Sequence, residues 1–85
     1  MISYELDARY DSRASFYSKA RVEQEGNIKR LRSYNTIVAE IDTERETAKV
    51  FGTFSDTTLR HIKEFLKQDD FIAETKAQII KDYMD

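Results

Sequence analysis

The stretch FYSKARVEQEGNIKRLRSYNTIVAEID (residues 16–42) contains two runs of alternating residues joined by Gly26 and Asn27. A two-residue loop with glycine first is typical of a tight β-hairpin, because glycine accepts the positive backbone angle that such a turn requires. The loop therefore predicts an antiparallel pair of strands in which Glu25 faces Ile28.

The register set by this turn sorts the side chains onto two faces. One face is largely apolar and pairs Val22 with Leu31, Ala20 with Ser33, Ser18 with Asn35, and Phe16 with Ile37. The other face is largely polar and pairs Glu23 with Arg30, Arg21 with Arg32, Lys19 with Tyr34, and Tyr17 with Thr36. A shift of one residue would mix the two sets, so the register is strongly specified.

Alternation extends the sheet on both sides of this hairpin. The segment ISYELDARY (residues 2–10) predicts an edge strand. The third strand continues to Asp42, and a loop at 43–46 leads into a fourth strand at 47–52. That loop places Asp42 opposite Thr47, Ile41 opposite Ala48, Glu40 opposite Lys49, and Ala39 opposite Val50. Residues 1–54 are therefore predicted to form a four-stranded antiparallel meander.

After residue 54 the apolar residues recur every three or four positions, which is typical of amphipathic helices. The segment SDTTLRHIKEFL (residues 55–66) begins with hydroxyl and acidic residues that suit a helix N-cap. The only histidine, His61, lies at the margin of the apolar stripe, and we expect it to be a structural or surface residue and not a catalyst. A second helix is predicted within 71–84, with Asp69 and Asp70 ending the first helix and capping the second.

These patterns predict one α+β domain over residues 1–85, in the order β-β-β-β-α-α. The sheet occupies residues 1–54, and the helices, in residues 55–85, pack on one of its faces. The predicted core consists of Phe16, Val22, Leu31, Ile37, Ala39, Ile41, Val50, Leu59, Ile62, Phe65, Leu66 and Ile79.

Composition argues against several classes of function. The 85 residues include no cysteine, one histidine and two separated glycines, so thiolate zinc sites and Gly-rich phosphate loops are excluded. No serine is placed against His61 by a short motif, and we expect neither an enzyme nor a bound cofactor or metal. No apolar run approaches the ~20 residues of a membrane span, and we expect a soluble cytoplasmic protein.

Two groups of residues are candidates for function. Residues 9–34 contain seven basic and three acidic residues, whereas residues 35–85 contain seven basic and eleven acidic residues. The polar face of the hairpin carries the candidate binding residues Tyr17, Lys19, Arg21, Arg30, Arg32 and Tyr34. Arginine and tyrosine are common anchors of protein interfaces, and cations with aromatic rings also suit nucleic acid. The second group is Ser18, Ser33 and Asn35, which form either a buried polar network or a small polar cleft beside His61.

The segments SYNT (residues 33–36) and TTLRHIKEFL (residues 57–66) are similar to those of a family of small uncharacterised proteins from phages and mobile elements of Gram-positive bacteria. The resemblance covers about residues 16–68 and leaves the last helix outside. It brings no catalytic residues. It implies an accessory protein that binds and modulates a host protein, such as a component of a defence system, with nucleic-acid binding as the alternative.

Overall fold

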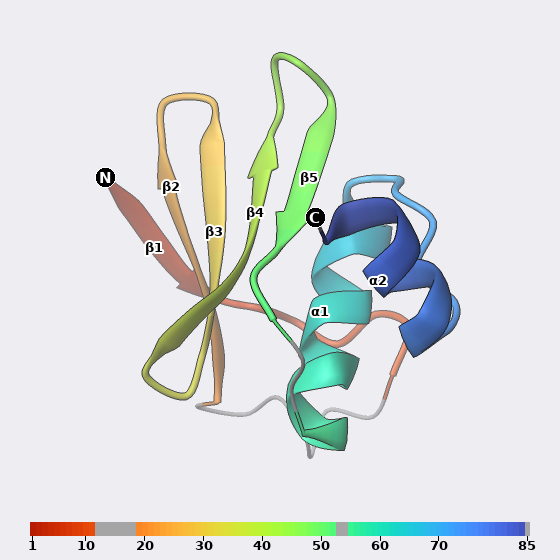
Figure 1. Cartoon of the computed structure of the whole chain (residues 1–85). Coiled ribbons are helices and arrows are strands. Elements are labelled where there is room, and N and C mark those ends of the chain that lie inside the picture. Colours follow the sequence, from red (N-terminus) through yellow and green to blue (C-terminus); the bar gives the residue numbers. More distant parts are fainter. Residues whose placement is uncertain (12–18, 53–54, 85) are drawn as a thin grey trace.

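The computed structural model describes residues 1–11, 19–52 and 55–84, which form one sheet with two helices beside it (Figure 1). The sheet has five antiparallel strands that lie side by side in chain order. The elements are β1 (Ile2–Glu5), β2 (Ala20–Glu25), β3 (Ile28–Ser33), β4 (Thr36–Asp42), β5 (Thr47–Val50), α1 (Asp56–Gln68) and α2 (Lys76–Tyr83). The predicted fold class, an α+β antiparallel meander followed by two C-terminal helices, is confirmed.

Both predicted hairpin registers are confirmed. Gly26 has a φ of 60°, and Val22 lies opposite Leu31 across the turn that it begins. Across the loop at 43–46, Asp42 lies opposite Thr47 as expected. In both hairpins the alternation of side chains and the turn length agree, which leaves a single register.

The number of strands differs from the prediction, because residues 28–42 form two strands and not one. A single strand over this range would extend about 50 Å. The described part of the chain measures 31 Å along its longest axis, so the strand has to fold back on itself. It does so through Tyr34 and Asn35, with Ser33 opposite Thr36. Contrary to the prediction, Asn35 and Ile37 therefore do not continue β3, and their predicted partners Ser18 and Phe16 lie outside the described residues. The amide of Tyr34 still donates to the carbonyl of Lys19 at 2.7 Å.

A β-bulge in β4 changes which residues of that strand reach the core. Leu31 lies opposite Ala39, but the next residue, Arg32, lies opposite Ile37, so Val38 is an extra residue in the ladder. Val38 and Ala39 are both buried, whereas Ile37 is only half-buried. The prediction that Ile37 is a core residue is wrong, and Val38 takes its place.

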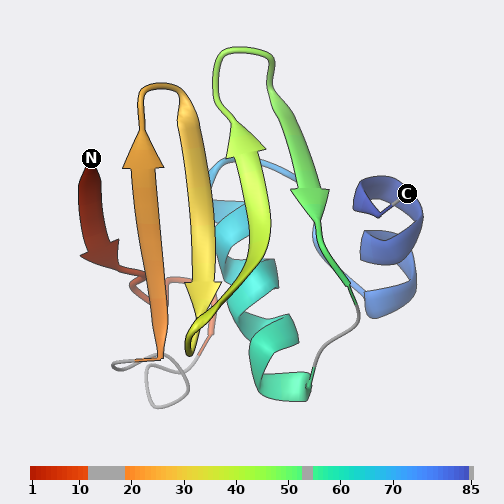
Figure 2. The ribbon, with the colours of Figure 1, turned by 60° about the vertical axis from the view of Figure 1, so that its left-hand side comes forward.

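The helices lie on one side of the sheet, as predicted (Figure 2). Helix α1 packs across β3 and β4, and α2 packs against β5. The buried core consists of Leu6, Ala20, Val22, Leu31, Val38, Ala39, Ile41, Val50, Ile62, Phe65, Leu66, Ala73 and Ile79. Of the other predicted core residues, Leu59 is partly buried against this cluster, and Phe16 lies outside the described residues.

Hydroxyl side chains cap both helices. Ser55 is the N-cap of α1 and accepts a hydrogen bond from the amide of Thr58, as expected from the sequence. Helix α1 ends at Asp69, its C-cap, as predicted. The N-cap of α2 is Thr75, so the predicted capping of this helix by Asp69 or Asp70 is wrong. Among the described residues, no helix is long and apolar enough to cross a membrane.

Candidate functional site

The face of the sheet opposite the helices carries three of the predicted binding residues. Arg21 follows the buried Ala20 in β2, and Arg32 precedes the buried Ser33 in β3, so both side chains point away from the core. The two arginines lie opposite each other, and Arg30 lies next to them on the same face. The structure thus brings together the three arginines that the register predicted to be neighbours.

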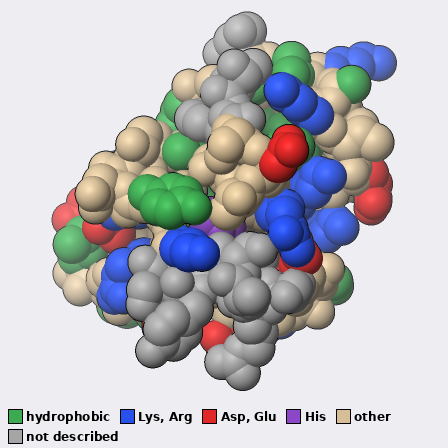
Figure 3. Space-filling view, turned by 90° about the horizontal axis from the view of Figure 1, so that it is seen from below, with side chains coloured by type: hydrophobic (Ala, Val, Ile, Leu, Met, Phe, Trp, Pro, Cys, Tyr) green, Lys and Arg blue, Asp and Glu red, His purple; other side chains and the backbone are tan. Residues whose placement is uncertain are grey.

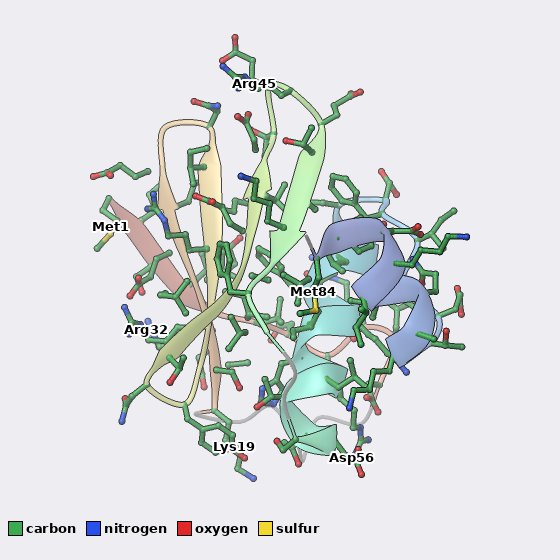
Figure 4. The ribbon with its side chains drawn as sticks, in the orientation of Figure 1. Met1, Lys19, Arg32, Arg45, Asp56 and Met84 are labelled. Atoms are coloured by element: carbon green, nitrogen blue, oxygen red, sulfur yellow. The ribbon has the colours of Figure 1, made fainter. Side chains whose placement is uncertain are left out.

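Two more of the predicted residues lie at the end of the sheet where β2 begins. Lys19 directly precedes β2 and is partly exposed, and Tyr34 is exposed in the turn between β3 and β4. Figure 4 places Lys19 and Arg32 at this end of the molecule. Tyr17 lies outside the described residues. We refer to the five described residues as the cationic surface: Lys19, Arg21, Arg30, Arg32 and Tyr34.

Two arginines of the cationic surface have carboxylate partners. The guanidinium of Arg32 donates to both oxygens of Glu23, at 3.1 and 3.2 Å, and Arg30 lies 3.5 Å from Glu40. The hydrogen bond from Arg32 lowers the pKa of Glu23, and the positive charges of Arg32, Arg21 and Arg30 add to the effect. This part of the face is therefore a lattice of alternating charges and not an uninterrupted basic patch.

Lys19 and Arg21 differ from the other two cations. Arg21 is exposed and donates to the hydroxyl of Ser3 at 3.2 Å. Within the described ranges of the chain, no carboxylate lies at ion-pair distance from either side chain. Figure 3 shows the molecule from below, with lysine and arginine side chains spread over the view and acidic side chains among them. Lys19 and Arg21 therefore add positive charge at this end of the sheet, although Arg21 lies opposite Glu5 and its charge also acts on Glu23.

A buried polar cluster lies beneath the same end, on the helix side of the sheet. The hydroxyl of Ser33 lies 2.8 Å from Nδ1 of His61 and 3.0 Å from the hydroxyl of Thr58. The ring of Tyr34 lies 6.0 Å from that of His61, centroid to centroid. Ser33 therefore belongs to a buried polar network, which is the first of the two interpretations of the sequence. Asn35 is exposed in the turn instead, and Ser18 lies outside the described residues.

Thr58 and Glu64 are buried polar residues whose hydrogen bonds were not predicted from the sequence. Glu64 in α1 accepts hydrogen bonds from the amide of Tyr10, at 2.8 Å, and from the side chain of Gln68, at 2.6 Å. Arg60, on the same helix, forms a bidentate pair with Asp11. These contacts hold the segment after β1 against α1. The i,i+4 spacing of Glu64 and Gln68 was the only local signal of this arrangement.

The geometry limits what chemistry the cluster performs. His61 is fully buried and Ser33 nearly so, so a substrate has no access to the imidazole in this conformation. A cleft of about 500 Å³ lies elsewhere, between the β4–β5 hairpin and the end of α1. Its lining includes Asp42, Glu46 and Asp70. Among the described residues, no group of three acidic or histidine side chains is arranged to hold a metal ion.

We expect the substitution His61→Ala to lower the free energy of unfolding by about 2–4 kcal/mol. It removes a buried ring and takes away a hydrogen-bond partner of Ser33. Urea unfolding followed by circular dichroism measures the loss. In a double-mutant cycle with Ser33→Ala, the double mutant should lose about 1 kcal/mol less free energy of unfolding than the sum of the two single losses. Strict additivity would show that the Ser33–His61 contact contributes nothing to stability.

The two segments that carried the resemblance meet in this cluster, since Ser33 and Tyr34 come from one and Thr58 and His61 from the other. Residues 4–81 match the sequence profile of a family of unknown function, DUF8033. The match extends the expected range of 16–68 in both directions and includes most of α2. No curated protein and no solved structure matches the chain. Because the family profile spans most of its length, the protein belongs to the DUF8033 family.

Proposed function

We propose that the protein is a non-enzymatic accessory module of a phage or mobile element, which binds an acidic surface of a host protein in the cytoplasm through the cationic surface. Binding would modulate that host protein, and a component of a defence system is the kind of target we expect. The observation that carries the proposal is the sheet face left uncovered by the helices, where Lys19 and Arg21 form no ion pair with the described residues, although Arg21 lies opposite Glu5.

The chemistry of this surface favours a protein partner. Tyr34 is 54% exposed, and tyrosine next to arginine is enriched among the residues that dominate interface energies. Lys19 and Arg21 supply charge that an acidic partner neutralises, which gives electrostatic complementarity and a faster association rate. The paired Arg30 and Arg32 are held in place by Glu40 and Glu23, so they present fixed positions to a partner.

Nucleic-acid binding is the alternative, and the charge lattice argues against it. Phosphate contacts supply most of the affinity of such modules, and each needs an available cation. Glu23 and Glu40 lie beside Arg32 and Arg30, so this face carries both signs of charge, and the whole chain has a net charge of −2. The sequence pI is about 5.4, whereas nucleic-acid-binding domains often have a value above ~9.

The proposal assigns no catalytic step to the Ser33–His61 contact. A general base has to reach the proton that it removes, within hydrogen-bond distance of a bound substrate. The imidazole of His61 is instead enclosed, with its Nδ1 engaged by a core hydroxyl. We propose that the cluster is structural and that it supports the turn at Tyr34.

A pull-down from host lysate tests the proposal, with the tagged protein used before and after nuclease treatment. We expect one protein to be recovered in both cases and to be lost with Arg21→Glu. The matched control is Lys76→Glu, which makes the same charge change at an exposed site on α2 and should leave recovery intact. Recovery that requires intact nucleic acid, or that is equally weak with both variants, contradicts the proposal.

A further inference from the structure

The sheet contains two tight turns with two central residues each. Gly26–Asn27 joins β2 to β3, and Tyr34–Asn35 joins β3 to β4. The first central residue has a positive φ in both, 60° at Gly26 and 56° at Tyr34. Neither asparagine has a positive φ, which is the pattern of a type II′ turn. Glycine is the residue favoured at the first position of such a turn.

Tyrosine at this position strains the backbone. A positive φ brings the Cβ atom of an L-residue close to its own backbone, and for a bulky side chain it is a genuine outlier. Burial does not offset the cost, because more than half of the Tyr34 side chain is exposed. Its one described ring contact is the tilted arrangement with His61 at 6.0 Å.

The surroundings of the turn hold this conformation in place. The amide of Tyr34 donates to the carbonyl of Lys19 at 2.7 Å, and Arg32 donates to the carbonyl of Asn35 at 3.2 Å. On the core side, Ser33 is fixed by Thr58 and His61. Strained residues that their surroundings fix in this way are concentrated at functional sites.

We infer that Tyr34 is the anchor of the cationic surface, a preorganised aromatic side chain that inserts into a pocket on an acidic protein. The inference rests on the proposed function, which it deepens by naming the residue that carries most of the affinity. Lys19 and Arg32 flank the turn, and their charges complement acidic groups around such a pocket. An aromatic ring with a fixed backbone loses little conformational entropy on binding.

The first part of the test measures strain without a partner. Tyr34→Gly should raise the thermal unfolding midpoint by about 4 °C, because it relieves the turn. Gly26→Tyr is the matched reverse change. A Cβ atom placed at Gly26 has no other atom within 4 Å, so a loss of stability in this variant reports the strain of the positive φ and not a steric clash. It should lower the midpoint by a similar amount. A lower midpoint for Tyr34→Gly would overturn the claim that Tyr34 is strained.

The second part measures affinity for the purified protein recovered in the pull-down, by calorimetry. Tyr34→Gly should weaken binding by about 30-fold, as expected for a hot-spot tyrosine, while Tyr34→Phe keeps most of the affinity. Binding that depends on Arg21 but not on Tyr34 overturns the anchor and leaves the proposed function standing. Failure to recover any protein overturns both.

Discussion

Replacing Phe65 with alanine is expected to lower the free energy of unfolding by about 3–5 kcal/mol. Phe65 lies on the sheet side of α1, is only 2% exposed, and borders Leu6 and Val22. A domain of this length has a total stability of roughly 4–13 kcal/mol, so the loss removes a large fraction of it. The chain has no tryptophan, so urea unfolding is followed by far-ultraviolet circular dichroism to measure the change.

Phe51→Ala is the matched control for this experiment. The same side chain is truncated, but Phe51 lies just after β5 and is 50% exposed. We expect it to change the free energy of unfolding by about 0.5 kcal/mol or less. Equal losses for the two variants would mean that α1 does not pack its apolar stripe on the sheet as described.

The double substitution Arg21→Glu with Arg32→Glu is expected to weaken binding of the protein partner by about 100-fold or more. The two residues lie opposite each other on the uncovered face, so the change replaces two neighbouring cations by two carboxylates beside Glu23. Like charges placed against an acidic partner repel it. Calorimetry with the purified partner measures the loss.

The fold should survive this double substitution with a modest loss of stability. Arg32 loses its ion pair with Glu23, but such partly exposed pairs contribute only about 0–1 kcal/mol. The control is Lys76→Glu with Lys81→Glu, which makes the same change in net charge on α2. Retained binding by the Arg21 and Arg32 variant, with loss in the α2 control, would move the binding site to the helices.

The parts of the fold that the sequence predicted depend on local patterns. The glycine turn at Gly26 fixes the first register, and Ser55 marks the start of α1. The turn at Tyr34 escaped prediction because it has no glycine and alternation continues through it. The bulge at Val38 escaped for a similar reason, since no glycine marks it and the prediction assumed unbroken alternation along β4.

The candidate site shows the same division. The register placed Arg21 and Arg32 opposite each other, and the structure bears this out. The diagonal pairing of Arg32 with Glu23 depends on side-chain reach across strands, which the register does not specify. The contact of Ser33 with His61 depends on how α1 is rotated over the sheet, and helical periodicity alone does not fix that rotation.

The most direct test of the central claim, that the cationic surface binds protein and not nucleic acid, is a fluorescence titration at near-physiological salt. Labelled single- and double-stranded nucleic acid are titrated with the wild-type protein and with the Arg21→Glu, Arg32→Glu variant. We predict no sub-micromolar binding to either nucleic acid, because the domain has a net charge of −2 and Glu23 and Glu40 lie among the four cations. Sub-micromolar binding that weakens steeply with salt and is lost in the variant would contradict the account.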